Sequence, residues 1–203
     1  MILLTIAVLW FAAAAAPGPN FILITRTALL QSRAAGVRTA CGIAGGACVW
    51  GLAGFFGVHA LFTLAPWLYA ALKLAGSIYL IALGVKYLIA GFRTDVVATV
   101  YTRSDTSPIR RGLLISIANP QSALSTASLF AATLPPNPTI LLGFGAVLVM
   151  AAVALVWYSF VACVLTLRPA AALFARLRQW IDRVAGLAFL GFGTKLAMNV
   201  YPD

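Results

Sequence analysis

Acidic residues are nearly missing from this 203-residue chain, which holds four Asp and Glu in total. All charged residues together make up 9% of the chain, whereas a soluble domain carries about 25%. With 63% hydrophobic residues, most of the chain has no polar face to turn toward water. One His and three Cys without a C-x-x-C pair provide neither a disulfide framework nor a metal site. We therefore predict a chain embedded in a lipid bilayer, with no cofactor and no metal.

Long apolar runs are what the sequence does have, and six of them approach or exceed the roughly 20 residues that cross about 30 Å of hydrocarbon. They are unbroken, whereas the strands of a membrane barrel are short and alternate in polarity. We predict an all-α membrane protein with six transmembrane helices. The runs are Met1–Thr25, Ala40–Ala65, Pro66–Tyr87, Gly112–Leu134, Ile140–Leu167 and Val184–Val200.

A net charge of +10 is also typical of nucleic-acid binders, but the basic residues fall in alternate connections between the runs. The second connection, "FTLAPW", and the fourth, "TLPPNPTI", hold none. The positive-inside rule then predicts that the first, third and fifth connections lie in the cytoplasm, that both termini lie outside and that the chain has no nucleic-acid partner. The first connection holds Arg26, Arg33 and Arg38, the third holds Lys86, Arg93, Arg103, Arg110 and Arg111, and the fifth holds Arg168, Arg176, Arg178 and Arg183.

The stretch "WFAAAAAPGPNF" in the first run is compatible with a signal-peptide cleavage site or with a broken membrane helix. A signal peptide begins with positive charge, but the first basic residue is Arg26, and the apolar run resumes as "FILIT". Pro17 and Pro19 lack amide donors and disfavour helix in the residue before them. We expect a helix to end near Ala16 and to restart with Pro19 in its first turn. A simple proline kink is the alternative.

A second break, Asn119-Pro120 in "ISIANPQSALS", follows about a hundred residues later. The third and sixth runs also match, because "KLAGSIYLIALG" and "RVAGLAFLGFG" share a basic residue, Ala-Gly and an aromatic-Leu pair, Tyr79-Leu80 in the first case. If the chain consists of two repeats of three membrane spans each, the odd number of spans makes the second repeat inverted relative to the first. We predict one transmembrane domain over 1–203, with a first repeat at about 1–92, a cytoplasmic loop at about 93–110 and a second repeat at about 111–203.

Inverted repeats that each contain a discontinuous helix are typical of secondary transporters, with the substrate site between the breaks. Half-helix N-termini favour an anionic group, and exposed carbonyls accept hydrogen bonds from an ammonium, so a zwitterion such as an amino acid fits both. We predict a transporter of small molecules and not an enzyme, without catalytic residues. The candidate substrate-binding residues are Pro17, Gly18, Pro19, Asn20, Lys73, Tyr79, Asn119, Pro120 and Gln121.

Several of these segments together resemble the LysE/RhtB family of bacterial amino-acid exporters. The resemblance rests on Pro17-Gly18-Pro19-Asn20, "RAAGVRTACGIAGGA", "KLAGSIYLIALG" and "RRGLLISIANPQSAL", which cover nearly the whole chain in the family's order. It implies an inner-membrane exporter of amino acids or related metabolites driven by the proton motive force. Many relatives have Asp after P-G-P where this chain has Asn20, so the proton carrier and the substrate charge do not carry over from the family.

Other polar groups have two interpretations each. Lys73 lies inside the third run and either serves the site or reaches the surface with its long stem. Arg26 ends the first span or faces an inner vestibule. His59, near the outer end of the second run, is either an ordinary interfacial residue or a proton carrier. Asp182 is expected at the edge of the sixth span, which leaves no acid inside the membrane.

The Gly42 and Gly46 pair forms G-x-x-x-G, which lets helices approach closely within one protomer or in a possible homodimer. Two other functions stay open. A cation or toxic-ion exporter of the same superfamily would expect hard oxygen or imidazole ligands in its core, which the sequence does not show. A purely structural membrane subunit would not need two related helix breaks.

Overall fold

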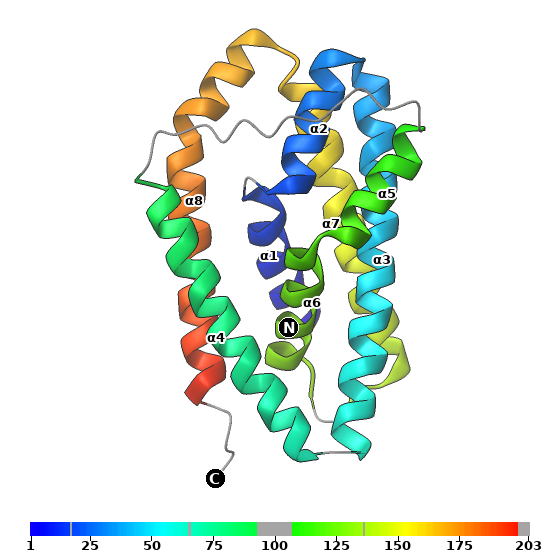
Figure 1. The fold of residues 1–203 in the computed structure, drawn as a ribbon, viewed down its shortest axis with the longest axis vertical. Coiled ribbons are helices and arrows are strands. Elements are labelled where there is room, and N and C mark those ends of the chain that lie inside the picture. The colour runs from blue at the N-terminus through cyan, green and yellow to red at the C-terminus, as the bar shows by residue number, and fades with distance from the viewer. Residues whose placement is uncertain (17, 65, 93–106, 136, 199–203) are drawn as a thin grey trace.

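Every element of the described chain is an α-helix (Figure 1). The computed structural model describes residues 1–16, 18–64, 66–92, 107–135 and 137–198; the side chains of 58–64, 66–70, 72–73, 168–175 and 178 lie outside the description. The fold class is therefore all-α over these residues, as the unbroken apolar runs predicted. The helices are α1 (Ile2–Ala15), α2 (Pro19–Leu30), α3 (Arg33–Leu64), α4 (Pro66–Ala90), α5 (Pro108–Ala118), α6 (Pro120–Thr133), α7 (Ile140–Val164) and α8 (Arg168–Met198).

Two stretches of the described residues are long and apolar enough to cross a membrane, Arg33–Gly57 and Ile140–Val164. The pair α1 and α2, bent by 61° at the break between them, makes a third if it is counted as one span. Leu74–Ala90 forms a shorter apolar helix. The described residues therefore contain two or three helices that pass this test of length and composition, fewer than the six apolar runs of the sequence.

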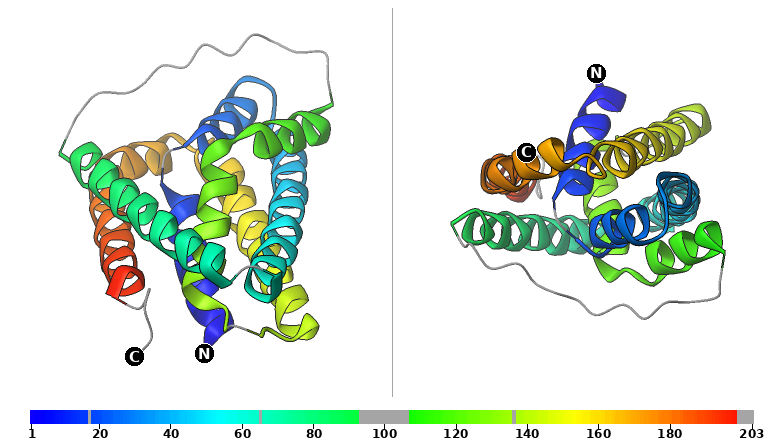
Figure 2. Two further views of the ribbon diagram at one scale, coloured as in Figure 1. Left: turned by 60° about the horizontal axis from the view of Figure 1, so that its bottom comes forward. Right: turned by 90° about the horizontal axis from the view of Figure 1, so that it is seen from above.

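The helices run up and down one body (Figures 1 and 2). In Figure 1, α1 begins in the lower half, and α8 ends at the lower side. The connections from α2 to α3 and from α7 to α8 lie at the upper side, and α6 joins α7 at the lower side. The short helices α1 and α6 lie in the middle, between the α4–α8 pair and the α3–α7 pair.

Two helices begin earlier than the apolar runs indicate. The second run was predicted from Ala40, but α3 begins at Arg33, and the sixth was predicted from Val184, but α8 begins at Arg168. The amphipathic residues before Val184 continue the same helix, so Asp182 lies inside α8 and is 0% exposed. The sequence did not indicate that Asp182 is enclosed by other helices, whereas its place at the edge of the sixth membrane span stays a prediction.

Glycines of α3 let α5 cross it at backbone distance. A Cβ at Gly42 would overlap the Ile109 carbonyl oxygen and lie 2.8 Å from the Leu113 amide nitrogen, and a Cβ at Gly46 would lie 2.5 Å from the Ser116 Cβ. The G-x-x-x-G pair therefore packs within one chain. The possible homodimer stays a prediction, and these two glycines do not supply its interface.

Candidate functional site

The first helix break lies between α1 and α2. Ala16 is extended, with φ −67° and ψ 138°, and α2 begins at Pro19, the residue at which the prolines predict a restart. Gly18 is the N-cap of α2, and no side chain caps the amides there. Because the first amides of a helix have no intrahelical acceptor and carry partial positive charge, this end of α2 attracts an anionic group.

The second break lies between α5 and α6, where Asn119 is extended and Pro120 is the first helical residue. The Asn119 side-chain oxygen accepts a hydrogen bond from the Gln121 amide at 3.0 Å. Asn119 is therefore the N-cap of α6, in addition to being a candidate substrate-binding residue. It also lines the cavity described next, so both roles coincide in one side chain.

A cavity lies between the two breaks, and we call it the break cavity. Its volume is about 40 Å³. Among the side chains that the structure describes, no charged one lines it. The lining residues are Trp10, Ala13, Ala14, Ala16, Gly18, Asn20, Ile43, Ala47, Ser116, Asn119, Gln121, Ser122, Ser125, Ala154 and Tyr158.

Gln121 joins the second break to the first break and to α4. Its side chain lies against Gly18, where a Cβ would come within 3.5 Å of the Gln121 Oε1 atom. Its Nε2 atom donates to the Tyr87 hydroxyl at 2.6 Å, and the Tyr79 hydroxyl donates to its main-chain carbonyl at 3.4 Å. Since Tyr79 and Tyr87 both lie on α4, one glutamine holds three elements around the cavity.

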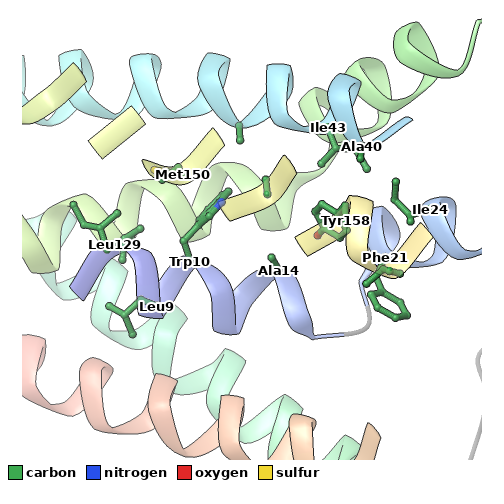
Figure 3. Close-up of a cluster of buried hydrophobic side chains, with 14 of the residues drawn as sticks. Leu9, Trp10, Ala14, Phe21, Ile24, Ala40, Ile43, Leu129, Met150 and Tyr158 are labelled. Atoms are coloured by element: carbon green, nitrogen blue, oxygen red, sulfur yellow. The ribbon is translucent and has the colours of Figure 1, made fainter. Parts of the chain in front are cut away.

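Three residues that line the break cavity each have a buried polar atom without a hydrogen-bond partner among the described residues. These atoms are the Trp10 Nε1 donor, the Asn20 Oδ1 acceptor and the Ser125 hydroxyl oxygen, and the three residues are 8%, 8% and 5% exposed. Asn20 lies beside the Tyr158 hydroxyl of α7, and Figure 3 shows Trp10 and Tyr158 among the side chains between α1 and α7. Because unpartnered buried polar groups are rare and costly, a donor and an acceptor left open here point to a polar ligand.

The structure brings four of the predicted site residues to one cavity, Gly18, Asn20, Asn119 and Gln121. Tyr79 contacts the site through the Gln121 carbonyl. Pro19 and Pro120 are the first residues of α2 and α6, where they end one helix and start the next. Pro17 and the side chains of Lys73 and His59 lie outside the described residues.

Sequence reasoning missed Trp10, Tyr87, Tyr158 and the serines of α6 at this site. Ser122 and Ser125 follow the second break by one helical turn, and this spacing was a signal for them. The aromatic residues lie in apolar runs, where nothing in the pattern separates a cavity-lining ring from a lipid-facing one. Asp182 was missed because its helix was predicted to begin after it.

Residues 11–200 match the family model described as LysE type translocator. The chain belongs to this family. The LysE/RhtB resemblance is thus confirmed, and the family is one of translocators and not of enzymes. The same membership, together with apolar helices long enough to span a bilayer, identifies a membrane protein.

Individual LysE-family relatives match along most of the chain. The threonine efflux protein of Escherichia coli (strain K12) is 28% identical over 98% of both chains. An uncharacterized membrane protein of Haemophilus influenzae is 29% identical over 90% of both. The leucine efflux protein of Salmonella choleraesuis is 29% identical over 56% of this chain and 54% of its own. No solved structure matches the chain.

Proposed function

We propose that this LysE-family protein exports small, electrically neutral amino acids or related zwitterions through the break cavity. The observation that carries the proposal is the cavity itself, in which two helix breaks meet and leave a buried donor and a buried acceptor open. The Trp10 N–H and the uncapped start of α2 suit a carboxylate. The Asn20 carboxamide oxygen suits an ammonium.

The lining of the cavity supports a neutral substrate over a basic one. A cationic side chain such as that of lysine would need a carboxylate partner in a buried site, and the described lining of the cavity has none. Ser122 and Ser125 instead provide hydroxyl groups for a small polar side chain. The relatives named threonine and leucine efflux proteins agree with a neutral amino acid.

A cavity of about 40 Å³ is little larger than the roughly 30 Å³ that one water occupies in the liquid, which is too small for an amino acid. Transport in this proposal therefore requires the cavity to widen toward one side at a time. We propose that it does so as two inverted three-helix units, α1 to α4 and α5 to α8, each with its first membrane helix broken. The breaks at Pro19 and Pro120 support this division, as does the match between the third and sixth apolar runs.

We further propose residence in the bacterial inner membrane with both termini outside, on the strength of the alternating arginine-rich connections. A reporter enzyme that is active only outside the cytoplasm, fused after Asp203, is expected to be active, and the same reporter inserted at Ser32 is expected to be silent. Ser32 lies in the short connection between α2 and α3. The reverse pattern would contradict this orientation.

The export proposal is tested by efflux of labelled amino acids from preloaded cells that produce the protein. We expect threonine and other small neutral amino acids to leave several-fold faster than from empty-vector cells, and lysine to leave no faster. The reason is the uncharged lining of the cavity. If no amino acid in the panel leaves faster than from empty-vector cells, the export proposal is wrong.

We propose the proton motive force as the energy source, as the family resemblance implies, with Asp182 as the candidate proton carrier. Asp182 is the only acidic residue in the described part of the chain. It is fully buried, and its carboxyl group lies close enough to the Tyr87 hydroxyl to interact with it electrostatically. Through Tyr87 and Gln121 it is connected to the break cavity.

Changing Asp182 to Asn is expected to abolish export against a gradient while preserving exchange of labelled for unlabelled substrate down the gradient. The reason is that an amide of the same shape keeps the packing but does not carry the proton. Uptake and exchange in proteoliposomes with an imposed pH difference measure both activities. Equal loss of both at normal protein level would refute Asp182 as the carrier.

A further inference from the structure

The carbonyl groups just before each helix break need donors from elsewhere in the molecule. In an unbroken helix the Gly18 amide would bond to Ala14, but here it donates to the Ala16 carbonyl at 2.8 Å. The residue that would bond to Ser116 is Pro120, which has no amide hydrogen. From the backbone, the Ser116 carbonyl accepts only a long hydrogen bond of 3.4 Å, donated by the Asn119 amide. In a membrane interior such carbonyls are costly unless they are paired.

Two tryptophans supply these donors. The Trp157 Nε1 atom of α7 donates to the Ala14 carbonyl of α1 at 3.0 Å. The Trp50 Nε1 atom of α3 donates to the Ser116 carbonyl of α5 at 3.1 Å. Ala14 and Ser116 are themselves buried, with exposed fractions of 6% and 2%.

The two indole bonds correspond to each other under the repeat. Trp50 and Trp157 lie about a hundred residues apart, as do the carbonyls they bind. Each lies on the helix that follows a broken helix, yet each bonds to the broken helix of the other half. The two hydrogen bonds therefore connect the two halves of the chain, because one joins α7 to α1 and the other joins α3 to α5.

Neighbouring contacts attach the same pairs of helices. The Trp157 ring packs edge-on against Phe11 of α1, with ring centroids 5.0 Å apart. The Ser116 hydroxyl of α5 donates to the Ile43 carbonyl of α3 at 3.4 Å, one turn of helix from Gly46. Each first half-helix is thus attached to one long helix by an indole bond at the break and by packing beside it.

We propose that Trp50 and Trp157 are positioning residues that fix α5 to α3 and α1 to α7, so that each first half-helix moves with a long helix of the other repeat. This inference rests on the proposed alternating-access exporter. From the breaks, α1 extends toward the lower side of Figure 1 and α5 toward the upper side. In this proposal the two half-helices therefore border opposite entrances of the break cavity. Loss of the Trp157 bond frees the outer entrance, and loss of the Trp50 bond frees the inner one.

The test uses Trp50→Phe and Trp157→Phe, which keep an aromatic ring and lose the N–H. Both are made in a background without Cys41, Cys48 and Cys163, with Ser122→Cys in the cavity lining as reporter. A membrane-impermeant maleimide is applied to spheroplasts for outer access and to inside-out vesicles for inner access. Trp180→Phe, an exposed tryptophan of α8, is the matched control.

We expect Trp157→Phe to raise the labelling rate about tenfold from outside only, and Trp50→Phe to raise it about tenfold from inside only. One lost hydrogen bond to a buried carbonyl shifts an opening equilibrium by about this factor. Trp180→Phe should leave both rates unchanged. Labelling that rises equally on both sides for either variant, or on neither side, overturns the proposal.

The labelling rates from the two sides are measured without substrate, so they test this inference separately from the export proposal. A wild-type protein that moves no amino acid but shows the two opposite shifts would refute export and keep the positioning roles. A protein that exports amino acids, with both variants labelled like wild type, would refute the positioning roles alone. Protein amount in the membrane, measured for each variant, normalises the rates.

Discussion

Replacing Gln121 by leucine is expected to lower amino-acid export at least about a hundredfold while leaving a folded protein in the membrane. Gln121 lines the break cavity, lies against Gly18 and donates to the Tyr87 hydroxyl at 2.6 Å. Leucine has a similar volume but no amide, so the site loses a polar contact and Tyr87 loses its donor. Two such losses at about 1–3 kcal/mol each correspond to roughly this factor.

Efflux of labelled substrate, divided by protein amount, measures the effect of Gln121→Leu. Gln31→Leu is the matched control, because Gln31 is exposed at the end of α2 and does not line the cavity. Tyr87→Phe should fall between wild type and Gln121→Leu, since it removes only the hydroxyl end of the pair. Export by Gln121→Leu at the rate of Gln31→Leu would show that the break cavity is not the substrate route.

The second large effect is expected from a single methyl group at Gly42. A Cβ at this position overlaps the Ile109 carbonyl oxygen and lies 2.8 Å from the Leu113 amide nitrogen, both backbone atoms of α5. Backbone cannot move aside as a flexible side chain can, so Gly42→Ala must separate α3 from α5. Overpacking of about 3 kcal/mol lowers the melting temperature by roughly 6–12 °C in a chain of this size.

Thermal unfolding of the purified protein in detergent measures this change. Gly57→Ala on the same helix is the control, because a Cβ at Gly57 meets nothing within 4 Å. Alanine at Gly57 should leave the melting temperature unchanged or slightly higher, since alanine favours helix over glycine. Equal melting temperatures for the two variants would mean that α5 does not pack on the Gly42 face of α3.

The sequence by itself determined the features that depend on local chemistry. A chain with few charged residues and long apolar runs predicts helices in a membrane, and proline without an amide donor predicts helix ends near Ala16 and Asn119. These properties belong to the residues themselves, whatever their neighbours are. Asn20, Asn119 and Gln121 could therefore be found as candidates from their place beside the breaks.

Only the tertiary structure decided which faces meet. In helices that are apolar on every side, periodicity does not distinguish a ring that lines a cavity from one that faces lipid. The sequence therefore did not identify Trp10, Tyr158 or the two positioning residues Trp50 and Trp157. From the sequence, Gly42 and Gly46 could pack against a helix of the same chain or of a second chain. The structure places α5 of the same chain against them. Asp182 became an interior residue because α8 begins at Arg168 and packs against α4, a result of contacts far apart in the chain.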